Sequence, residues 1–502
     1  MFKKILIANR GEIAVRIIRG CREMGVLTVA VYSEADRDSL HVQEADEAVL
    51  IGPAPAVESY LNMDAVLKAA QKTGAEAVHP GYGFLAENPV FSRRCGEEDL
   101  VFIGPNPKSM ELVGDKVRAR KIMEKAGVPI IPGMKGIKKN LDEYEAHAGK
   151  IGFPVMIKAS AGGGGKGMRI IRSSEELRPG LEAGQREALS AFGDESVYLE
   201  KYIEEPRHVE FQVLADNYGN MVHLFERECS IQRRHQKIIE ESPSLALDEE
   251  LRQEMGRTAC RVVAETGYSN AGTVEFLLDK DKNFYFLEVN ARLQVEHPVT
   301  ELVTGVDLVH QQIQIASGEK LQLDQGDLCQ RGHAVECRVY AEDPLNQFLP
   351  SSGKVLYYHE PSGPGIRNDY GIQSGSEVPI HYDPILAKLI VWAENRDRAC
   401  KRTLQALNDY VIFGIKTNID FLKAVIEHES FKKGATTTGF IEKHLKDWPG
   451  AEGKEENREL ALLAAAFLCE NKQGWQVHSE ESSPEMPSPW SILGGWRLGK
   501  GD

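Results

Sequence analysis

The 502-residue chain contains little cysteine, and none of it has the spacing of a metal or redox motif. Its eight cysteines lie at positions 21, 95, 229, 260, 329, 337, 400 and 469, and no C-x-x-C pair occurs. The pattern therefore indicates neither a zinc ribbon nor a redox pair. The cysteines are also too sparse for a disulfide scaffold, so we expect a reducing compartment, with the cytoplasm as the default.

The chain also lacks a long apolar run and an excess of positive charge. No run reaches the roughly 18 residues that a membrane span needs. Charged residues interrupt the apolar N-terminal stretch at Arg10 and Glu12, which leaves no signal-peptide core. Sixty Lys and Arg residues stand against 75 Asp and Glu residues, a formal net charge of −15. We therefore expect no membrane and no nucleic acid as partner, although local cations can still hold a small anion.

Short apolar strands alternate with amphipathic helices in the first part of the chain. Residues 5–8 and 27–32 are expected strands with an apolar helical stripe between them, and further strands are expected at 77–79 and 101–103. Such βαβ units predict a parallel sheet with helices on its faces. A helical connector at 115–128 follows.

Four consecutive glycines lie between two expected strands, 155–158 and 168–171. The segment Ala159-Ser-Ala-Gly-Gly-Gly-Gly-Lys-Gly167 allows backbone N–H groups to approach an anion closely. It is not a Walker A loop, because Gly167 follows Lys166 where Ser or Thr is needed and a strand follows instead of a helix. Two interpretations stay open: a flexible hairpin tip, or a lid over a triphosphate that Lys158 would also reach.

Two acidic residues face each other in an expected hairpin. Residues 272–278 and 284–292 are expected strands joined by turn residues at 279–283, which places Glu275 opposite Glu288. Directly opposed carboxylates repel each other, and their apolar neighbours argue against a solvated outer face. A cation between the carboxylates removes the conflict, and oxygen ligands suit Mg²⁺ with nucleotide phosphates.

The second of these strands leads into a polar segment. Strand alternation places Glu288, Asn290 and Arg292 on one face and continues through Gln294 and Glu296. The alternation supplies a guanidinium fork for a small oxyanion, a hydrogen-bonding amide and a candidate general base.

Further cations occur at 233–237 and at Arg338. Taken singly, such clusters are usually solvated surface. Beside a Mg²⁺–ATP site they would be placed to stabilise a developing phosphoanion.

Together these motifs resemble the biotin carboxylase component of biotin-dependent carboxylases, in the ATP-grasp superfamily. The matching blocks are residues 5–14, 79–88, 114–116, 158–168, 207–212, 226–237 and 288–297. The resemblance covers about residues 1–446 and implies a mixed α/β and α+β fold. An N-terminal parallel α/β sheet domain would precede an ATP-grasp fold, with a small lid domain and a larger antiparallel-sheet domain, and a C-terminal biotin carboxylase subdomain.

The resemblance also implies domain boundaries. The expected divisions are 1–112 for the N-terminal domain, 113–203 for the connector and glycine-rich lid, 204–330 for the ATP-grasp catalytic domain, 331–446 for the C-terminal domain and 447–502 for a linker and helix tail. Residues 488–498 resemble the segment that, in long acyl-CoA carboxylase α chains, leads into the domain contacting the β subunit. This favours an acyl-CoA carboxylase over a pyruvate carboxylase.

Each motif position receives an implied role. For ATP, the residues are Lys116 and Lys158 on the phosphates, Gly164, Gly165 and Lys166 in the lid, Glu200, Lys201 and Ile203 around adenine, and His208, Gln232 and His235 on the ribose and phosphate side. Mg²⁺, or alternatively Mn²⁺, would be held by Glu275, Glu288 and Asn290. For bicarbonate and biotin, the residues are Arg292, Gln294 and the Val295 backbone as the cradle, Glu296 as the base, Arg338 for the biotin enolate and Lys237 for the phosphoryl charge.

The implied reaction makes carboxyphosphate from ATP and bicarbonate and then carboxylates biotin on a carrier. Carriers hold biotin in a Met-Lys-Met hairpin, and the near match at 133–136 lacks the second Met, so we interpret it as a turn. The carrier and the carboxyltransferase are therefore expected on separate chains or were cut away, and the family's habit is a homodimer. The alternatives are another ATP-grasp carboxylate or amine ligase and a non-catalytic ATP-binding regulatory subunit. The Glu296–Arg338 pair counts against the former, and the retained motif residues count against the latter.

Overall fold

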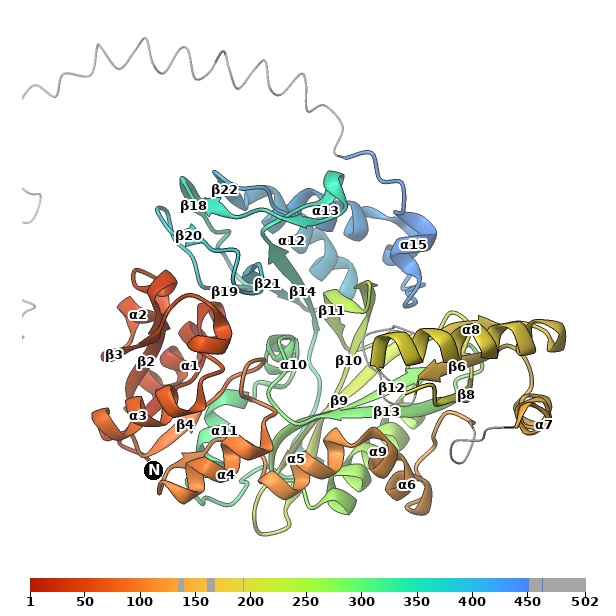
Figure 1. Ribbon diagram of the computed structural model, residues 1–502. Helices are drawn as coiled ribbons and strands as arrows, with labels where there is room; N and C mark the ends of the chain where they lie inside the picture. Colours follow the sequence, from red (N-terminus) through yellow and green to blue (C-terminus); the bar gives the residue numbers. More distant parts are fainter. Residues whose placement is uncertain (134–139, 160–167, 193, 451–462, 464–502) are drawn as a thin grey trace, which may run out of the picture. The chain divides into compact units, whose positions relative to one another are not determined.

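The computed structural model describes residues 1–133, 140–159, 168–192, 194–450 and 463. The chain divides into two compact units, Met1–Gly450 and Ala451–Asp502, and the first unit carries all the elements described below (Figure 1). Within the described ranges, no helix is long and apolar enough to cross a membrane. The expected helix tail and the segment at 488–498 lie outside the described residues.

The N-terminal segment forms a five-stranded parallel sheet in the order β3-β2-β1-β4-β5, as the βαβ pattern predicts. Ile5 and Ile7 pack toward α1, whereas Leu6 packs toward α3 and α4, so both faces are covered. The strands are β1 (Lys4–Ile7), β2 (Leu27–Ser33), β3 (Glu47–Gly52), β4 (Ala77–His79) and β5 (Val101–Phe102). The helices are α1 (Gly11–Glu23), α2 (Leu40–Glu44), α3 (Met63–Thr73), α4 (Pro89–Glu97), α5 (Pro107–Gly114) and α6 (Lys116–Lys125).

A small antiparallel sheet in the order β7-β6-β8 follows. Its elements are α7 (Leu141–Ile151), β6 (Val155–Ala159), β7 (Arg169–Ile171), α8 (Ser174–Phe192) and β8 (Val197–Lys201). Val155 and Ile157 alternate into a core that they share with Leu177 and Leu181 of α8, which lies against β6 (Figure 1). The glycine-rich loop between β6 and β7, residues 160–167, lies outside the described residues.

One eight-stranded antiparallel sheet, in the order β13-β12-β9-β10-β11-β14-β21-β19, spans the rest of the unit. Its strands are β9 (Arg207–Ala215), β10 (Met221–Arg233), β11 (Gln236–Ser242), β12 (Asn270–Leu278), β13 (Phe284–Asn290), β14 (His333–Tyr340), β19 (Ile366–Tyr370) and β21 (Ile385–Ala393). β11 pairs with β14, for example through Glu240 and Glu336, so the sheet continues across the expected domain division at residue 330. The expected fold class, a parallel sheet followed by a large antiparallel sheet, is confirmed.

Helices and short strands surround this sheet. The helices are α9 (Glu249–Thr266), α10 (His297–Thr304), α11 (Leu308–Ala316), α12 (Arg396–Asp409), α13 (Ile419–Glu427), α14 (Glu429–Lys432) and α15 (Phe440–His444). The short strands are β15 (Glu342–Asp343), β16 (Leu349–Pro350), β17 (Gly353–Lys354), β18 (Tyr357–His359), β20 (Glu377–Val378) and β22 (Val411–Phe413). α9 packs on β9 and β10, and α12 packs on β14 and β21.

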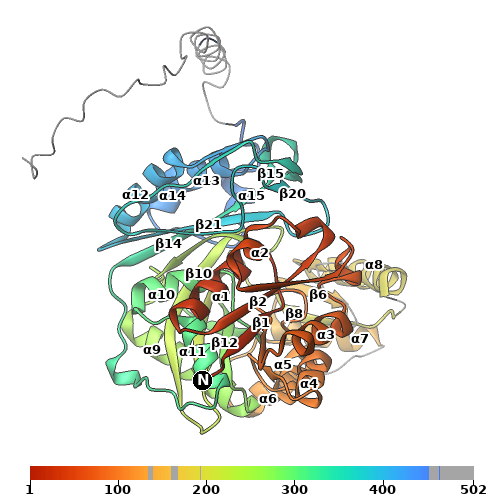
Figure 2. The same cartoon turned by 90° about the vertical axis from the view of Figure 1, so that its left-hand side faces the viewer.

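Buried ion pairs fasten the N-terminal segment to the large sheet. α1 contacts α11, β19 and β21. Figure 2 shows the red N-terminal segment, with α1, in front of the strands of the large sheet. Arg16 of α1 lies 3.0 Å from Glu301 and 2.7 Å from Asp307, and Arg367 of β19 lies 2.7 Å from the second oxygen of Glu301. Breaking such a pair leaves a buried charge without compensation, so these contacts hold the segments in one arrangement.

Gly256 provides a test of how tightly α9 packs on the sheet. A Cβ at Gly256 would lie 2.4 Å from the His223 ring, which packs edge-on between Phe211 and Phe225. We expect Gly256→Ala to lower the free energy of unfolding by about 1–3 kcal/mol through overpacking. Gly149→Ala in α7 is the control, because no atom lies within 4 Å of its added Cβ. It should stabilise by about 0.5–1 kcal/mol, and a thermal midpoint for Gly256→Ala at or above wild type would contradict this packing.

Candidate active site

One face of the central strands is polar although it is buried. On β9, His208, Glu210 and Gln212 alternate with Val209 and Phe211, and the two apolar side chains belong to the core beneath α9. Strand geometry therefore directs the three polar side chains to the opposite face. Their exposed fractions are only 5%, 0% and 0%, so their polar groups need partners within the protein.

Lys237 of β11 is the central cation of this face. Its Nζ lies 2.6 Å from Glu296 Oε1 and 2.9 Å from Glu275 Oε1. It also contacts Glu210 Oε2 at 2.5 Å and donates to Gln294 Oε1 at 3.3 Å. Burial lowers the pKa of Lys237, but the three carboxylates outweigh burial and raise that pKa well above its usual value. Lys237 is therefore a cation throughout the neutral range, and it compensates three buried acids.

Glu296 is held at both carboxylate oxygens. Oε1 accepts a hydrogen bond from Lys237 Nζ, and Oε2 lies 2.9 Å from Arg338 Nη2. Burial raises the pKa of this fully buried side chain, but Lys237, Arg338 and Arg227 outweigh burial and keep the pKa well below its usual value. Glu296 therefore carries no proton at neutral pH, which is the state that a general base needs.

Arg338 of β14 also pairs with a second acid, Glu240, which was not identified from the sequence. Its Nε donates to Glu240 Oε1 at 2.6 Å, across a separation of 98 residues. Burial raises the pKa of Glu240 to about 7, and the Arg338 guanidinium opposes this rise. Arg338 is thus fixed between Glu240 and Glu296, with its planar group oriented from both sides.

Arg227 of β10 and its partner Glu210 were also missed. Arg227 is fully buried; its Nε donates to Glu210 Oε1 at 2.7 Å, and its Nη atoms donate to Gln212, Thr273 and Thr300 at 2.8, 3.0 and 3.1 Å. Arg227 therefore holds one carboxylate oxygen of Glu210, and the Lys237 ammonium contacts the other. Both residues lie within motif blocks, and the alternation of polar with apolar residues along the strands was the signal that could have found them.

Glu275 and Glu288 are directly opposed across β12 and β13, as the hairpin predicts. Glu275 also contacts His208 Nε2 at 2.9 Å and accepts from Asn290 Nδ2 at 2.7 Å. Burial raises the pKa of Glu275, but Lys237 and His208 outweigh it and keep the pKa well below its usual value. An ionised carboxylate opposite a second one, beside an amide, is an oxygen donor set that fits a hard divalent cation such as Mg²⁺.

The segment after β13 departs from the expected strand. We expected the strand to reach 292 and its alternation to continue through Glu296, but β13 ends at Asn290 and residues 291–296 form an irregular segment with a bend at Arg292 and a turn at 295–296. The chain turns because α10 begins at His297 with a proline in its first turn. Gln294 faces inward in this turn and donates to Glu275 Oε1 at 3.2 Å. The turn thus brings Gln294 and Glu296 to Lys237 without strand pairing.

The other residues of this segment have their own partners. Arg292 Nε lies 3.2 Å from Glu87 Oε2, and its Nη2 donates to Asn290 Oδ1 at 3.2 Å. The carbonyl of Val295 accepts a hydrogen bond from Lys388 Nζ at 3.0 Å. Neither Glu87 nor Lys388 was identified from the sequence.

A separate group lies on the small sheet. Lys158 Nζ of β6 is 2.5 Å from Glu200 Oε2 of β8, and Arg120 pairs with the second oxygen of Glu200. Lys201 ends β8, and Ile203 lies two residues beyond it. The structure therefore brings Lys158, expected at the phosphates, into contact with Glu200, expected at adenine, with Arg120 as an additional partner.

Several expected residues fall outside these contacts. Gly164, Gly165 and Lys166 lie outside the described residues, as does the side chain of Lys116 at the start of α6. Gln232 is opposite Lys237 in the β10–β11 hairpin. His235 is exposed at the hairpin turn, with a φ of 68°.

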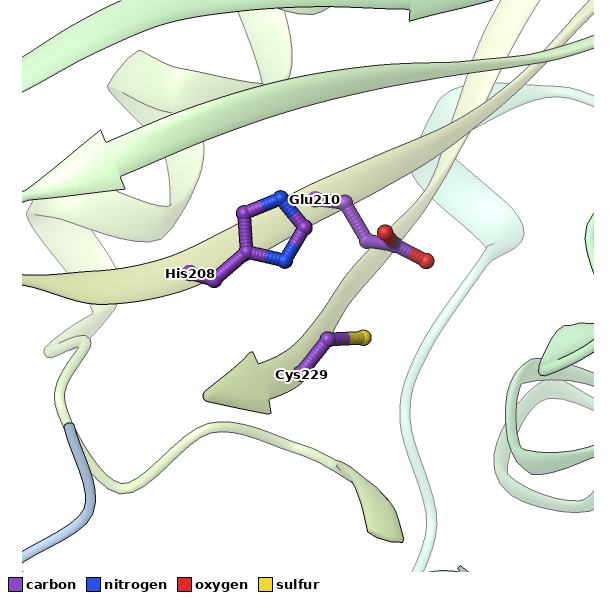
Figure 3. Close-up of side chains that lie close together, drawn as sticks. All are labelled: His208, Glu210 and Cys229. Atoms are coloured by element: carbon purple, nitrogen blue, oxygen red, sulfur yellow. The ribbon is translucent and has the colours of Figure 1, made fainter. Parts of the chain in front are cut away.

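His208, Glu210 and Cys229 form a compact group whose ligand atoms lie within 4.8 Å of one another. Figure 3 shows one ring nitrogen of His208 turned toward the other two side chains. A soft metal ion would need the Cys229 thiolate, but burial and the Glu210 carboxylate raise the pKa of Cys229 well above its usual value. Both oxygens of Glu210 already contact Arg227 and Lys237. The group therefore belongs to the charge network, and we assign it no metal.

Comparison with known proteins identifies the family. The chain matches "Biotin carboxylase, N-terminal domain" over residues 1–110, "Carbamoyl-phosphate synthase L chain, ATP binding domain" over 115–324 and "Biotin carboxylase C-terminal domain" over 336–443. It is 53% identical to a subunit of pyruvate carboxylase from Methanothermobacter thermautotrophicus over 476 residues, which cover 94% of this chain and 96% of that protein. The chain belongs to the biotin carboxylase family.

Other members of the family match over most of their length. The mitochondrial propionyl-CoA carboxylase alpha chain of Homo sapiens is 50% identical over 504 residues, which cover 99% of this chain and 68% of that protein. The crystal structure of the biotin carboxylase domain dimer of Hydrogenobacter thermophilus 2-oxoglutarate carboxylase, in complex with MgADP, ADP and bicarbonate, is 50% identical with a TM-score of 0.82. The alignment covers 88% of this chain and 98% of that one. As a member of this family, the chain is an ATP-dependent ligase.

Replacement of Lys237 tests whether one ammonium compensates three acids. Lys237→Met leaves the buried carboxylates of Glu210, Glu275 and Glu296 without their shared cation, so at pH 7.5 the free energy of unfolding should fall by about 3–5 kcal/mol. The difference from wild type should shrink toward pH 5, because those carboxylates then take up protons more readily. Lys416→Met, at an exposed surface ion pair, is the control and should change stability by less than about 1 kcal/mol. Equal losses in both variants would contradict the central role of Lys237.

Proposed function

We propose that this chain carries out the ATP- and bicarbonate-dependent carboxylation of biotin on a carrier protein, through carboxyphosphate, as the biotin carboxylase subunit of an acyl-CoA carboxylase. Glu296 carries the proposal, because it is an ionised, fully buried carboxylate between Lys237 and Arg338. A carboxylate that has no proton of its own, flanked by two cations, suits a reaction that deprotonates one anion while negative charge develops beside it.

ATP is proposed to bind between the small sheet and the polar face of the large one. Lys116 and Lys158 contact the phosphates beneath the lid residues Gly164, Gly165 and Lys166. Glu200, Lys201 and Ile203 surround adenine, and His208, Gln232 and His235 line the ribose and phosphate side. The Lys158–Glu200 pair supports this assignment, because it holds the lysine beside the residues proposed for adenine.

Mg²⁺, or alternatively Mn²⁺, is proposed to be held by Glu275 and Glu288, with Asn290 beside them. The opposed register of the two acids and the low pKa of Glu275 support this donor set. When bound, the cation supplies neutralisation of phosphate oxygens during phosphoryl transfer.

Bicarbonate is proposed to bind to Arg292, Gln294 and the backbone N–H of Val295, within reach of Glu296. Glu296 takes the bicarbonate proton, and the resulting carbonate oxygen attacks the γ-phosphorus of ATP and releases ADP. The phosphoryl charge also attracts the Lys237 ammonium. Because that cation keeps the pKa of Glu296 low, its movement toward the phosphate raises this pKa and strengthens the base when the proton is transferred.

Biotin is proposed to react next, beside Arg338. Carboxyphosphate breaks down to CO₂ and phosphate, and the phosphate removes the ureido N–H proton of biotin. The negative charge of the biotin enolate then falls beside the Arg338 guanidinium, and the enolate nitrogen attacks CO₂. Arg338 donates hydrogen bonds to both Glu240 and Glu296. These bonds support the role, because a fixed cation needs no reorganisation as the charge develops.

The proposed partners are a biotin carboxyl carrier protein or domain, a separate carboxyltransferase and a second copy of this chain. The dimer of the Hydrogenobacter thermophilus domain supports the homodimer. We also propose a cytoplasmic location. The domain roles expected from the sequence are proposed unchanged: residues 1–112 as pre-ATP-grasp domain, 113–203 as connector and lid, 204–330 as catalytic domain, 331–446 as C-terminal domain and 447–502 as the partner-binding tail.

The acyl-CoA assignment is supported by the tail. The human propionyl-CoA carboxylase alpha chain aligns with 99% of this chain, so that alignment extends into the segment at 488–498. A pyruvate carboxylase is the second candidate, because the Methanothermobacter thermautotrophicus protein aligns over 96% of its own length. Another ATP-grasp ligase would not need the paired Glu296 and Arg338, and a non-catalytic protein would not need an ionised base.

Hydrolysis of ATP tests the proposed half-reaction. The purified chain should hydrolyse ATP only with bicarbonate present, and free biotin should stimulate it. Glu296→Gln should lower kcat by about 100-fold or more, because the base is lost, whereas ATP binding measured by calorimetry should stay within about two-fold of wild type. Glu319→Gln at the exposed surface is the matched control and should keep the wild-type rate. Hydrolysis that is independent of bicarbonate, or wild-type rates in Glu296→Gln, would contradict the proposal.

The acceptor is tested with the assembled complex. The chain is isolated from its native source with its carrier and carboxyltransferase and incubated with ATP, [¹⁴C]bicarbonate and either acetyl-CoA, propionyl-CoA or pyruvate. We expect acid-stable label in an acyl-CoA. Label that appears only with pyruvate would replace the acyl-CoA assignment by the second candidate.

A further inference from the structure

Lys388 is a fully buried lysine that the proposed chemistry does not use. It lies in the middle of β21, with 0% of its side chain exposed. Its Nζ donates to the carbonyl oxygen of Val295 at 3.0 Å and lies 3.2 Å from Glu12 Oε2 and 3.7 Å from Asp369 Oδ2. A buried ammonium is costly unless it is paired, so a lysine retained here needs such compensation.

Three distant parts of the chain meet at this ammonium. Glu12 lies in the first turn of α1, Asp369 in β19 and Val295 in the turn before α10. Burial lowers the pKa of Lys388, but Glu12 and Asp369 outweigh this and raise it, so the group stays charged. Asp369 is held in turn by Arg367, at 2.8 Å. The ammonium is therefore fixed from two sides; it also lies 5.9 Å from the centroid of the Tyr82 ring and contacts the Val295 carbonyl.

The register of the sheet relates Lys388 to Arg338. The two residues are directly opposite each other on β14 and β21, so their side chains leave the same face of the sheet. Arg338 contacts the carboxylate of Glu296, and Lys388 contacts the carbonyl of Val295, the residue before it. Arg338 thus holds the side chain of Glu296, and Lys388 holds the backbone of Val295. Two adjacent residues of the turn are held by two cations that lie opposite each other on neighbouring strands.

A hold on this carbonyl has a geometric consequence. The Val295 carbonyl belongs to the same rigid peptide plane as the N–H of Glu296, and its direction sets ψ of Val295. A hydrogen bond that fixes this carbonyl therefore restrains the position of the Glu296 Cα, from which the side chain projects. It also restrains the direction of the neighbouring N–H of Val295. Residues 291–296 form no strand pairing that would do this instead.

We propose that Lys388 is a positioning residue that orients the bicarbonate-binding turn through the Val295 carbonyl, with Glu12 and Asp369 holding its ammonium in place. This inference rests on the proposed function, because it assigns Lys388 to the turn that is proposed to bind bicarbonate. Lys388 touches no substrate in this account; it acts through Val295 and Glu296.

The test compares the KM values of bicarbonate and ATP in Lys388→Met. Loss of a charged hydrogen bond to the turn should raise the KM of bicarbonate by about ten-fold. The KM of ATP should stay within about two-fold, because the contacts of Lys388 include none of the described residues proposed for the nucleotide. Lys388→Met leaves Glu12 without its cation, whereas Asp369 keeps Arg367. The same measurement is therefore made in the Glu12→Gln/Lys388→Met double variant, which removes the uncompensated charge.

Gly256→Ala is the control for stability, because its added Cβ meets the His223 ring beneath α9 and not the turn. It should lower the thermal midpoint without raising the KM of bicarbonate. A bicarbonate KM of wild-type size in both Lys388 variants would overturn the inference, and so would equal rises in the KM of ATP and bicarbonate. A wild-type chain without bicarbonate-dependent hydrolysis would instead contradict the proposed function itself, so the two failures are distinguishable.

Discussion

The structure of this site depends on one electrostatic constraint: buried carboxylates must share a small number of cations. Glu210, Glu275 and Glu296 all reach the Lys237 ammonium, and in a low-dielectric interior their mutual repulsion would be large without it. A single ammonium shared by three acids suits a reaction that introduces further negative charge. It compensates the acids in the absence of substrate, and in the proposed reaction the phosphate becomes its alternative partner.

Further arginine and lysine residues hold the acids and the backbone around Lys237. Arg227 holds Glu210 and Arg338 holds Glu296, while Lys388 holds the backbone one residue earlier. These cations come from neighbouring strands of one continuous sheet, so their spacing is set by strand pairing and not by flexible loops. The eight-stranded sheet crosses the expected division at residue 330 and places residues from the ATP-grasp and C-terminal segments on a single frame.

Local sequence rules predicted a large part of this arrangement. The βαβ pattern predicted the parallel sheet, and the turn chemistry at 279–283 predicted the opposed Glu275 and Glu288. The motif resemblance indicated Glu296, Arg338 and Lys237, which the structure brings into direct contact. The extension of β13 to residue 292 was wrong, because inward hydrogen bonds and the start of α10 override strand alternation there.

Residues recognised only through distant partners were missed. Glu240 pairs with Arg338, which lies 98 residues away in the sequence, and Lys388 contacts a carbonyl that lies 93 residues away. No periodicity within one segment predicts such pairs, because β21 by itself is an apolar run with one charge and the polar residues of β11 do not indicate which strand will lie beside them. The roles expected of Gly164, Gly165 and Lys166 stay predictions, since these residues lie outside the described part of the chain.

The transfer of oxygen from bicarbonate to phosphate tests the central claim most directly. The chain is incubated with ATP, biotin and bicarbonate labelled with ¹⁸O at all oxygens, and the phosphate formed is examined by ³¹P NMR or mass spectrometry. If bicarbonate attacks the γ-phosphorus after Glu296 removes its proton, each phosphate released should carry one ¹⁸O atom. Phosphate without ¹⁸O, whose fourth oxygen comes from water, would show that ATP is hydrolysed without carboxyphosphate and would contradict the account.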